Sequence, residues 1–284
     1  MEDFIEENGP NPDDFQKRHG KVPVIFCSPP CQSFSGINRD VDHNGVNDLY
    51  RKNLSLKFFE AMKTTGALVG VFENVEGMWR RPNIYFLKKI VLDHLRAGYQ
   101  VRVRLHFSHV FGDPQSRPRI IVYVAKKFVE MPNVLETHGP DRLSPVTAGT
   151  ALKALQKHVE KVQNDPEAER VPNTEGSKME WRPNGDMNVL NLDKPATTID
   201  CGGRVWHPTE ERALTVREVA SIQSYPPHYK FLGSVTDQYK QVGNAVPGKM
   251  AKAIASAIGE SLRFVYDEEN EEETKGPMVC ELTN

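Results

Sequence analysis

Hydrophobic and polar positions change their spacing along the chain in a way that predicts alternating strands and helices. Continuous apolar runs or strict alternation predict strands at 22–28, 67–74, 99–107 and 119–125. Between them, apolar residues recur at the spacing of one helical face in residues 49–63 and 83–96. This alternation predicts an α/β fold, in which helices pack on a sheet.

The second half of the chain is less regular. Residues 156–195 are polar, without a clean period, and order returns with expected helices at 214–223, opened by Thr215, and at 249–262. The predicted organisation has five parts: a loose acidic lead-in (1–20), an α/β core (21–155), a small irregular region (156–211), a return to the core (212–263) and an acidic disordered tail (264–284).

Composition narrows the class of protein. A chain of 284 residues with 38% hydrophobic residues can bury a core, which argues against a disordered protein. It has no apolar stretch long enough for a membrane span, and its acidic N-terminus does not have the pattern of a secretory signal. The four cysteines are too few and too scattered for a disulfide framework, which favours the reducing interior of a cell.

Charge is segregated along the chain despite a formal net charge of −2. Residues 1–15 and 267–273 are strongly acidic, and the body between them carries a surplus of Lys and Arg. A basic body is compatible with a polyanionic partner. The alternative is that the acidic runs are solvated ends and the basic surplus is spread evenly; composition does not choose between the two.

The segment SPPCQSFSG (28–36) follows the first predicted strand directly. A Cys at this junction can be exposed at the carboxyl edge of the sheet, where α/β sites form. Two prolines fix the backbone before Cys31, and small residues after it make a mobile loop, which suits a nucleophile under a lid. The alternative is a buried structural thiol, which is the expectation for Cys27. No ligand set completes a Cys27–Cys31 metal pair.

Two further strand ends carry polar side chains. Glu73 ends an apolar run in VFENVEGM (71–78), so burial is expected to raise its pKa and suit it to general acid work. Arg117 and Arg119 stand two apart at a strand start and are expected to project to one face, where they suit an anion or a polar base edge. The alternatives are a surface Glu and solvated flanking charges. Strand ends at one edge of a parallel sheet share a cleft, so the three motifs together predict one site.

These segments resemble the motifs of the DNA (cytosine-5)-methyltransferase family. PPCQSFSG is similar to the catalytic Pro-Cys loop of this family, FENVEGM to its Glu-Asn-Val motif and QSRPR to its Gln-x-Arg-x-Arg motif. Later segments resemble the motifs at and beyond the end of its recognition region: DKPATTID (193–200), RALTVREVASIQSYP (212–226) and QVGNAVPGKMAKAI (241–254). The matches follow the family order across residues 22–262, which makes the resemblance specific.

The resemblance implies a reaction. The Cys31 thiolate would attack C6 of a cytosine flipped out of double-stranded DNA, and Glu73 would hydrogen-bond or protonate N3. C5 would then take a methyl group from the cofactor S-adenosylmethionine, and loss of the C5 proton would expel Cys31. Arg117 and Arg119 would orient the base and neighbouring groups. Flipping is needed because C5 cannot be reached inside a stacked duplex.

The resemblance also implies binding residues and a fold. The implied cofactor-binding residues are Pro30, Asn244 and Val246. The implied DNA-binding residues are Gln32, Ser33, Ser35 and Arg204. No metal is implied. The implied fold is a Rossmann-like S-adenosylmethionine-dependent methyltransferase sheet with a small target-recognition region over residues 156–211.

Three segments are more similar to the eukaryotic maintenance and chromomethylase branches than to bacterial restriction enzymes: SGINRD (35–40), GYQVRVRL (98–105) and GRVWHP (203–208). This implies an epigenetic enzyme in the nucleus, with the cytoplasm as the alternative. The transfer-RNA-methylating branch is the rival on substrate, but its usual Cys-Phe-Thr triplet is not present in this sequence.

One family feature is not found. A Phe-x-Gly-x-Gly loop, followed by an acidic residue that binds the cofactor, normally precedes the Pro-Cys loop, yet residues 1–30 contain no such loop. The sheet is therefore expected to be a partial Rossmann-like sheet. The hypotheses are a truncated methyltransferase, half of a split enzyme that needs a second chain, or a non-catalytic DNA-binding or scaffolding relative. Intact Cys31, Glu73, Arg117 and Arg119 weigh against the last. An RNA cytosine-5 methyltransferase is a further alternative.

Overall fold

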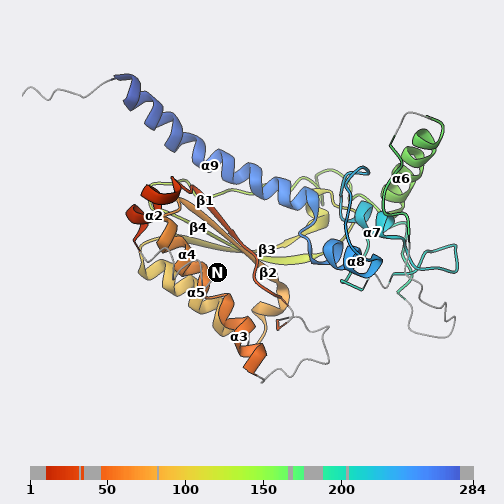
Figure 1. The fold of residues 1–284 in the computed structure, drawn as a ribbon, viewed down its shortest axis with the longest axis horizontal. Coiled ribbons are helices and arrows are strands. Elements are labelled where there is room, and N and C mark those ends of the chain that lie inside the picture. The colour runs from red at the N-terminus through yellow and green to blue at the C-terminus, as the bar shows by residue number, and fades with distance from the viewer. Residues whose placement is uncertain are drawn as a thin grey trace, which may run out of the picture. The chain divides into compact units, whose positions relative to one another are not determined.

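The computed structural model describes residues 11–31, 33–34, 46–81, 83–165, 169–175, 188–202 and 205–275. These residues form two compact units (Figure 1). Unit 1 takes its residues from Met1–His106, Arg119–Val134 and Ile254–Asn284, and unit 2 from Phe107–Pro118 and Leu135–Ala253. The chain therefore passes between the units several times.

The four predicted strands are present and form one sheet. They are β1 (Val24–Cys27), β2 (Val69–Val75), β3 (Gln100–Phe107) and β4 (Pro118–Ala125), in the order β1-β2-β4-β3. β1 runs parallel to β2, whereas β4 runs antiparallel to β2, with Arg119 opposite Val75. The α/β class is confirmed, but the sheet is mixed rather than parallel. The start of β4, not its end, therefore lies beside the end of β2.

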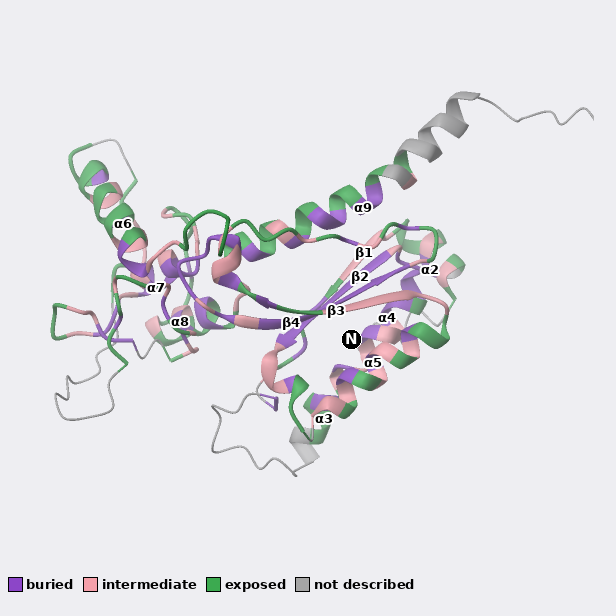
Figure 2. Cartoon of the chain, turned by 180° about the vertical axis from the view of Figure 1, so that it is seen from behind, coloured by how far each residue is buried: buried purple, intermediate pink, exposed green. Residues whose placement is uncertain are grey.

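Helices α4 (Lys57–Thr65) and α5 (Ile84–Arg96) contribute to the core of unit 1. Figure 2 shows buried positions along the strands and on the inner sides of these helices. Gly70 is needed where α4 packs on β2, because a Cβ there would lie 2.8 Å from Cζ of Phe58 and 3.0 Å from Cε of Met62. Burying each side chain of this size stabilises the fold by about 1.5–3 kcal/mol.

The helix expected at 49–63 is divided into two. α3 (Val46–Leu54) ends before Ser55, and α4 begins at Lys57. The N–H groups of Ser55 and Leu56 donate to carbonyls three residues back, those of Lys52 and Asn53, at 3.1 and 2.9 Å. Such tight bonds interrupt the regular four-residue ladder and so separate the helices. The helix expected at 83–96 is confirmed as α5.

Both ends of unit 1 are more helical than expected. Residues 12–19 of the lead-in form α2 (Pro12–His19), because the Asn11 side chain accepts the Asp13 N–H at 3.0 Å, Pro12 occupies the first turn and Phe15 is buried. At the other end, α9 (Gly248–Lys275) continues through the acidic segment, where a disordered tail was expected from 264. Glu is a good helix former, so the segment extends a helix that packing has already nucleated.

Unit 2 contains α6 (Ala148–Gln163), α7 (Val216–Ile222), α8 (Val235–Asn244) and the first turns of α9. α6 reaches into the region expected to be irregular; Thr147 caps it by accepting the Thr150 N–H at 3.1 Å, and Leu155 and Val162 are buried. α7 begins after Thr215, as predicted. The core cluster of unit 2 includes Ile199, Val205, Leu214 and Val242.

Residues 188–202 and 205–214 of unit 2 are held by isolated bridges rather than long strands. Trp206 pairs with both Val189 and Ala213, and Gln115 pairs with Ala196. Among the described residues, no helix is long and apolar enough to cross a membrane. The boundaries of the five predicted segments at 155 and 211 stay predictions.

Candidate active site

Glu73 is a buried carboxylate near the end of β2, held on both oxygens. The Ser28 hydroxyl donates to Oε2 at 2.5 Å, and Nε of Arg119 lies 2.7 Å from Oε1. The Glu73 and Arg119 side chains are each only 7% exposed. Each carboxylate oxygen has a second lone pair, so this group can still bind a substrate atom while it is fixed in place.

Strand register brings these three residues together. Cys27 of β1 lies opposite Phe72 of β2, so the next residues along the two parallel strands are Ser28 and Glu73. On the other side, Glu73 lies opposite Ile121 of antiparallel β4. Arg119 is two residues before Ile121, so it projects from the same face of the sheet as a diagonal neighbour of Glu73.

Cys31 lies on the loop that leaves β1. Its side chain is partly exposed, and its carbonyl accepts the N–H of Phe34 at 2.9 Å in a tight turn. The loop is tied to β2 because Nδ2 of Asn74 donates to the Pro29 carbonyl at 3.4 Å. This places an accessible thiol near the end of the strand that carries Glu73.

Cys27 differs from Cys31 in its environment. It is buried in β1, and burial raises the pKa of its thiol to about 12. A thiol with so high a pKa is not the thiolate that attacks an electrophile at neutral pH. The sequence-based interpretation of Cys27 as a buried thiol is confirmed.

Arg117 has partners that differ from those of Arg119. It precedes β4, lies in unit 2 and is buried, and its guanidinium donates to the carbonyl of Ile199 at 2.7 Å and to that of Gly243. The two arginines were expected to project together from one strand. β4 begins at Pro118, so only Arg119 lies within the strand, and the two side chains have different partners. In this structure Arg117 joins two backbone segments of unit 2.

Gly243 lies where α8 meets the segment 199–201. A Cβ on Gly243 would lie 2.6 Å from the Asp200 carbonyl oxygen and from Cα of Cys201. The next residue, Asn244, is exposed, and its amide oxygen accepts a hydrogen bond from Sγ of Cys201 at 2.9 Å. Arg117 and Gly243 therefore keep the Asn244 backbone close to residues 199–201.

Comparison with known proteins identifies the family. The model of the C-5 cytosine-specific DNA methylase family matches residues 5–183 and 147–260. The chain belongs to this family. It is 31% identical over 265 residues to the type II methyltransferase M1.HphI of Haemophilus parahaemolyticus, an alignment that covers 84% of this chain and 69% of the relative. It is 32% identical over 250 residues to M.AplI of Arthrospira platensis, covering 83% and 68%.

Structural comparison supports the methyltransferase fold. The Entamoeba histolytica methyltransferase EhMeth superposes with a TM-score of 0.57 at 13% identity, over 90% of this chain and 82% of that one. C-5 cytosine methylases are enzymes that use S-adenosylmethionine, so the predicted family, activity class and cofactor are confirmed. The resemblance to eukaryotic branches is not confirmed, because the two relatives that match in sequence, M1.HphI and M.AplI, are bacterial type II enzymes.

The predicted site residues of this methylase fall into three groups. Cys31, Glu73, Arg119, Pro30 and Ser33 lie in unit 1, where Pro30 is exposed and Ser33 is buried. Unit 2 contains Arg117, Asn244 and Val246, the last of which is partly buried. Gln32, Ser35 and Arg204 lie outside the described residues.

Two residues that hold the site were not assigned from the sequence. Ser28 donates to Glu73, and Asn74 ties β2 to the Pro-Cys loop. Both stand inside the motifs that carry Cys31 and Glu73, immediately after a strand or at its end. A search for polar residues next to each predicted strand end would therefore have found them.

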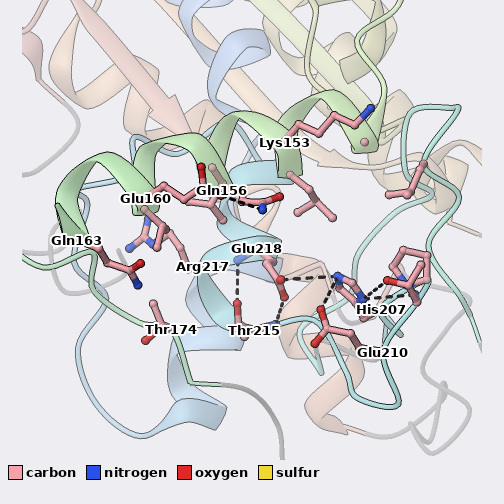
Figure 3. Close-up of a pocket in the computed structure, with 17 residues that line it drawn as sticks. Lys153, Gln156, Glu160, Gln163, Thr174, His207, Glu210, Thr215, Arg217 and Glu218 are labelled. Atoms are coloured by element: carbon pink, nitrogen blue, oxygen red, sulfur yellow. Dashed lines mark hydrogen bonds and ion pairs between the residues drawn. The ribbon is translucent and has the colours of Figure 1, made fainter.

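Unit 2 also contains a cavity of about 660 Å³ between α6 and α7 (Figure 3). Two of its carboxylates already have partners: Arg212, which does not line the cavity, binds both oxygens of Glu218 at 2.8 and 2.9 Å, and Glu210 lies 3.5 Å from Nε2 of His207. Burial would raise the pKa of Glu218, but Arg212 and the Thr215 N–H hold it below its usual value. This ion-paired carboxylate stabilises the start of α7.

Among the described residues, no cluster of three His, Cys, Asp or Glu could hold a metal ion.

Proposed function

We propose that this chain transfers a methyl group to C5 of cytosine in double-stranded DNA through a covalent adduct between Cys31 and C6. The observation that supports this most strongly is the arrangement at adjacent strand ends. A partly exposed Cys31 follows β1, and a buried Glu73 near the end of β2 is fixed by Ser28 and Arg119. A scaffold has no need for both groups in this arrangement.

In this proposal, Cys31 supplies the nucleophile. Its sulfur forms a bond to C6, and the electron pair of the C5–C6 double bond becomes available at C5. Glu73 hydrogen-bonds or protonates N3, so that negative charge does not accumulate on the ring. Loss of the C5 proton after methylation restores the double bond and releases the Cys31 sulfur.

Arg119 has the role of orienting Glu73. Because its guanidinium contacts Oε1 and Ser28 contacts Oε2, the carboxyl plane is fixed before the base arrives. Such fixed polar groups lose little entropy when the substrate binds. We assign Arg117 a positioning role, because it joins the backbone at Ile199 and Gly243.

S-adenosylmethionine supplies the electrophilic methyl group when it is bound. The residues proposed to hold it are Pro30, Asn244 and Val246. Asn244 fits a polar cofactor, because it is exposed and its NH₂ group can donate a hydrogen bond. Its amide oxygen is already held by Sγ of Cys201. We further propose that a segment carrying the missing glycine loop, on the same polypeptide or on a second chain, completes the site.

The proposed adduct is tested with a duplex in which 5-fluorocytosine replaces cytosine. Fluorine at C5 cannot leave as a proton does, so a methylating enzyme stays bonded to the base. With S-adenosylmethionine and the completing segment present, we expect the wild-type chain to give a covalent protein–DNA species by mass spectrometry, and Cys31→Ser to give none. Cys280→Ser, which removes another thiol, is the matched control and should still be trapped. Loss of trapping in both variants would contradict the role of Cys31.

Two further measurements test the substrate and the cofactor site independently. Transfer of tritium from labelled S-adenosylmethionine to duplex DNA and to RNA of the same sequence distinguishes the DNA enzyme from the RNA alternative. Equilibrium dialysis of the labelled cofactor with the chain alone tests the completing segment. Tight cofactor binding by the chain alone would show that the completing segment is not needed. If the segment is present and neither trapping nor methyl transfer occurs, the result favours a non-catalytic relative. Localisation in the nucleus or cytoplasm stays a prediction.

A further inference from the structure

A group of exposed aromatic and basic residues follows the strand that carries Glu73. After β2 the chain forms a short 3-10 turn, η1 (Glu76–Trp79), and then α5. Trp79 and Tyr85 are 57% and 61% exposed, and Arg81 and Lys88 are also exposed. These four residues are called the η1–α5 surface below.

We propose that the η1–α5 surface binds the DNA strand beside the flipped cytosine. Arg81 and Lys88 contact phosphates, and Trp79 and Tyr85 pack against bases that have lost their stacking partner. The proposal rests on the function proposed above, because only an enzyme that flips a base creates such a strand in duplex DNA. It assigns a binding role to residues outside all the motifs already described.

Ring contacts place this surface next to the Cys31 loop. The Phe34 N–H donates to the Cys31 carbonyl, and the Phe34 ring packs edge-on against that of Phe86 in α5, with centroids 5.8 Å apart. The Phe86 ring in turn contacts that of Tyr85, with centroids 5.4 Å apart. Tyr85 is therefore two ring contacts away from the turn that holds Cys31.

The segment is firmly anchored, so its exposed side chains are presented in defined positions. Met78, Leu87 and Ile90 are buried, and Figure 2 shows exposed positions alternating with buried ones along α5. The turn before α5 is fixed because Nδ2 of Asn83 donates to the Gly77 carbonyl at 3.2 Å. Large aromatic rings left in water on a fixed segment indicate a contact surface more than a packing defect.

Charge favours a polyanion as the occupant. The acidic residues of this segment are already paired, Glu76 with Arg80 at 2.5 Å and Asp93 with Lys89 at 2.8 Å. In the described part of the chain, Arg81 and Lys88 form no ion pair, so the surface keeps two uncompensated positive charges. Tyr85 and Lys88 are three residues apart on α5 and share a face. Positive groups interleaved with aromatic rings are the combination that binds unstacked strands.

The chain offers a matched control at the far end of the same sheet. Ala125 ends β4 opposite Val69, the first residue of β2, and Lys127 and the 68% exposed Phe128 follow it. This pair has the same chemistry as Arg81 and Tyr85. It lies about 20 Å away along the strands, given a rise of about 3.4 Å per residue. Non-specific DNA binding would be weakened equally by substitutions at either end of the sheet.

The test measures binding of the full chain to fluorescein-labelled duplexes by anisotropy. One duplex is fully paired and the other carries an unpaired cytosine, and salt is varied between about 50 and 200 mM. We expect Arg81→Ala and Lys88→Ala each to reduce the slope of log K against log salt by about 0.9, the value for one lost phosphate contact. Tyr85→Ala should weaken binding to the unpaired duplex at least about fivefold and leave the slope unchanged.

Lys127→Ala and Phe128→Ala should change neither quantity. Equal losses in these controls, or unchanged slope and affinity in all the η1–α5 variants, would overturn the proposed surface. Single-stranded RNA that competes as well as the unpaired duplex would overturn DNA as its occupant. A wild-type chain that binds no DNA contradicts the proposed function itself. A wild-type chain that is trapped by 5-fluorocytosine, with variants that bind normally, contradicts only this surface.

Discussion

Glu73 owes its environment to two residues that are distant in the sequence. Ser28 follows β1 and Arg119 lies in β4, and together they fix both carboxylate oxygens. All three residues lie in sequence motifs, and Glu73 and Arg119 were assigned from them. Their contacts with one another, however, depend on the register of β1, β2 and β4. The spacing of Arg117 and Arg119 within their motif likewise did not reveal that the two side chains have different partners.

Arg119→Ala is expected to destabilise the fold strongly, because it leaves the buried Glu73 carboxylate without its cation. Breaking a buried ion pair in this way costs about 3–5 kcal/mol. Urea unfolding monitored by circular dichroism measures the loss. Arg142→Ala removes a cation from the exposed pair with Glu136 and should cost less than about 1 kcal/mol. Similar losses in both variants would contradict a special role for the buried pair.

Gly243→Ala is expected to destabilise unit 2 by about 1–3 kcal/mol, because the added Cβ would clash with backbone atoms of Asp200 and Cys201 that cannot move cheaply. Thermal unfolding gives the change. The control is Gly259→Ala in α9, where a Cβ meets nothing within 4 Å. That variant should gain up to about 1 kcal/mol from the better helix propensity of Ala. A stable Gly243→Ala protein would show that residues 199–201 can move away from α8.

The helices show which local signals sufficed. α5 was expected from its apolar spacing alone, and α7 from apolar spacing that follows the capping residue Thr215. The break between α3 and α4 was not expected, because a continuous apolar spacing does not reveal where i→i+3 bonds replace the regular ladder. α2 was not expected because its eight residues are mostly polar, and one buried Phe15 together with a cap decides it.

Thr215→Ala is expected to cost about 0.5–2 kcal/mol, because Thr215 and Glu218 form a reciprocal capping box at the start of α7. Chemical denaturation of the full chain measures it. Thr236 is exposed inside α8, and Thr236→Ala should be neutral or slightly stabilising, since Ala is the better helix former there. If both changes have the same effect, the capping box does not contribute to stability.

Stability of the whole molecule depends on pH through His94. This side chain is fully buried among Phe58, Phe59 and Tyr99, and its Nδ1 donates to the Ile90 carbonyl at 2.7 Å. Burial lowers the pKa of His94 below its usual 6.5. The unfolded chain therefore binds a proton below about pH 6.5 that the folded chain excludes. His94 thus favours unfolding as the pH falls from 6.5 to its lowered folded pKa, and has no such effect above 6.5.

We expect the free energy of unfolding to fall by up to about 1.4 kcal/mol per pH unit in this window because of His94. Urea unfolding at several pH values between 5 and 8 measures the slope. His94→Phe, which keeps an aromatic ring in the same core, should make the slope shallower. His228→Gln, which removes an exposed histidine, should leave it as in the wild type. An unchanged slope in His94→Phe would contradict this assignment.

The sequence by itself determined the four strands, the helices with a clear apolar spacing, the family and the positions of Cys31 and Glu73. Each of these depends on local periodicity or on a short motif, and so on residues that are neighbours in the chain. Tertiary structure alone decided the antiparallel course of β4, the partners of Glu73 and the partners of Arg117. These depend on strand register and on contacts between segments far apart in sequence, which local spacing does not encode.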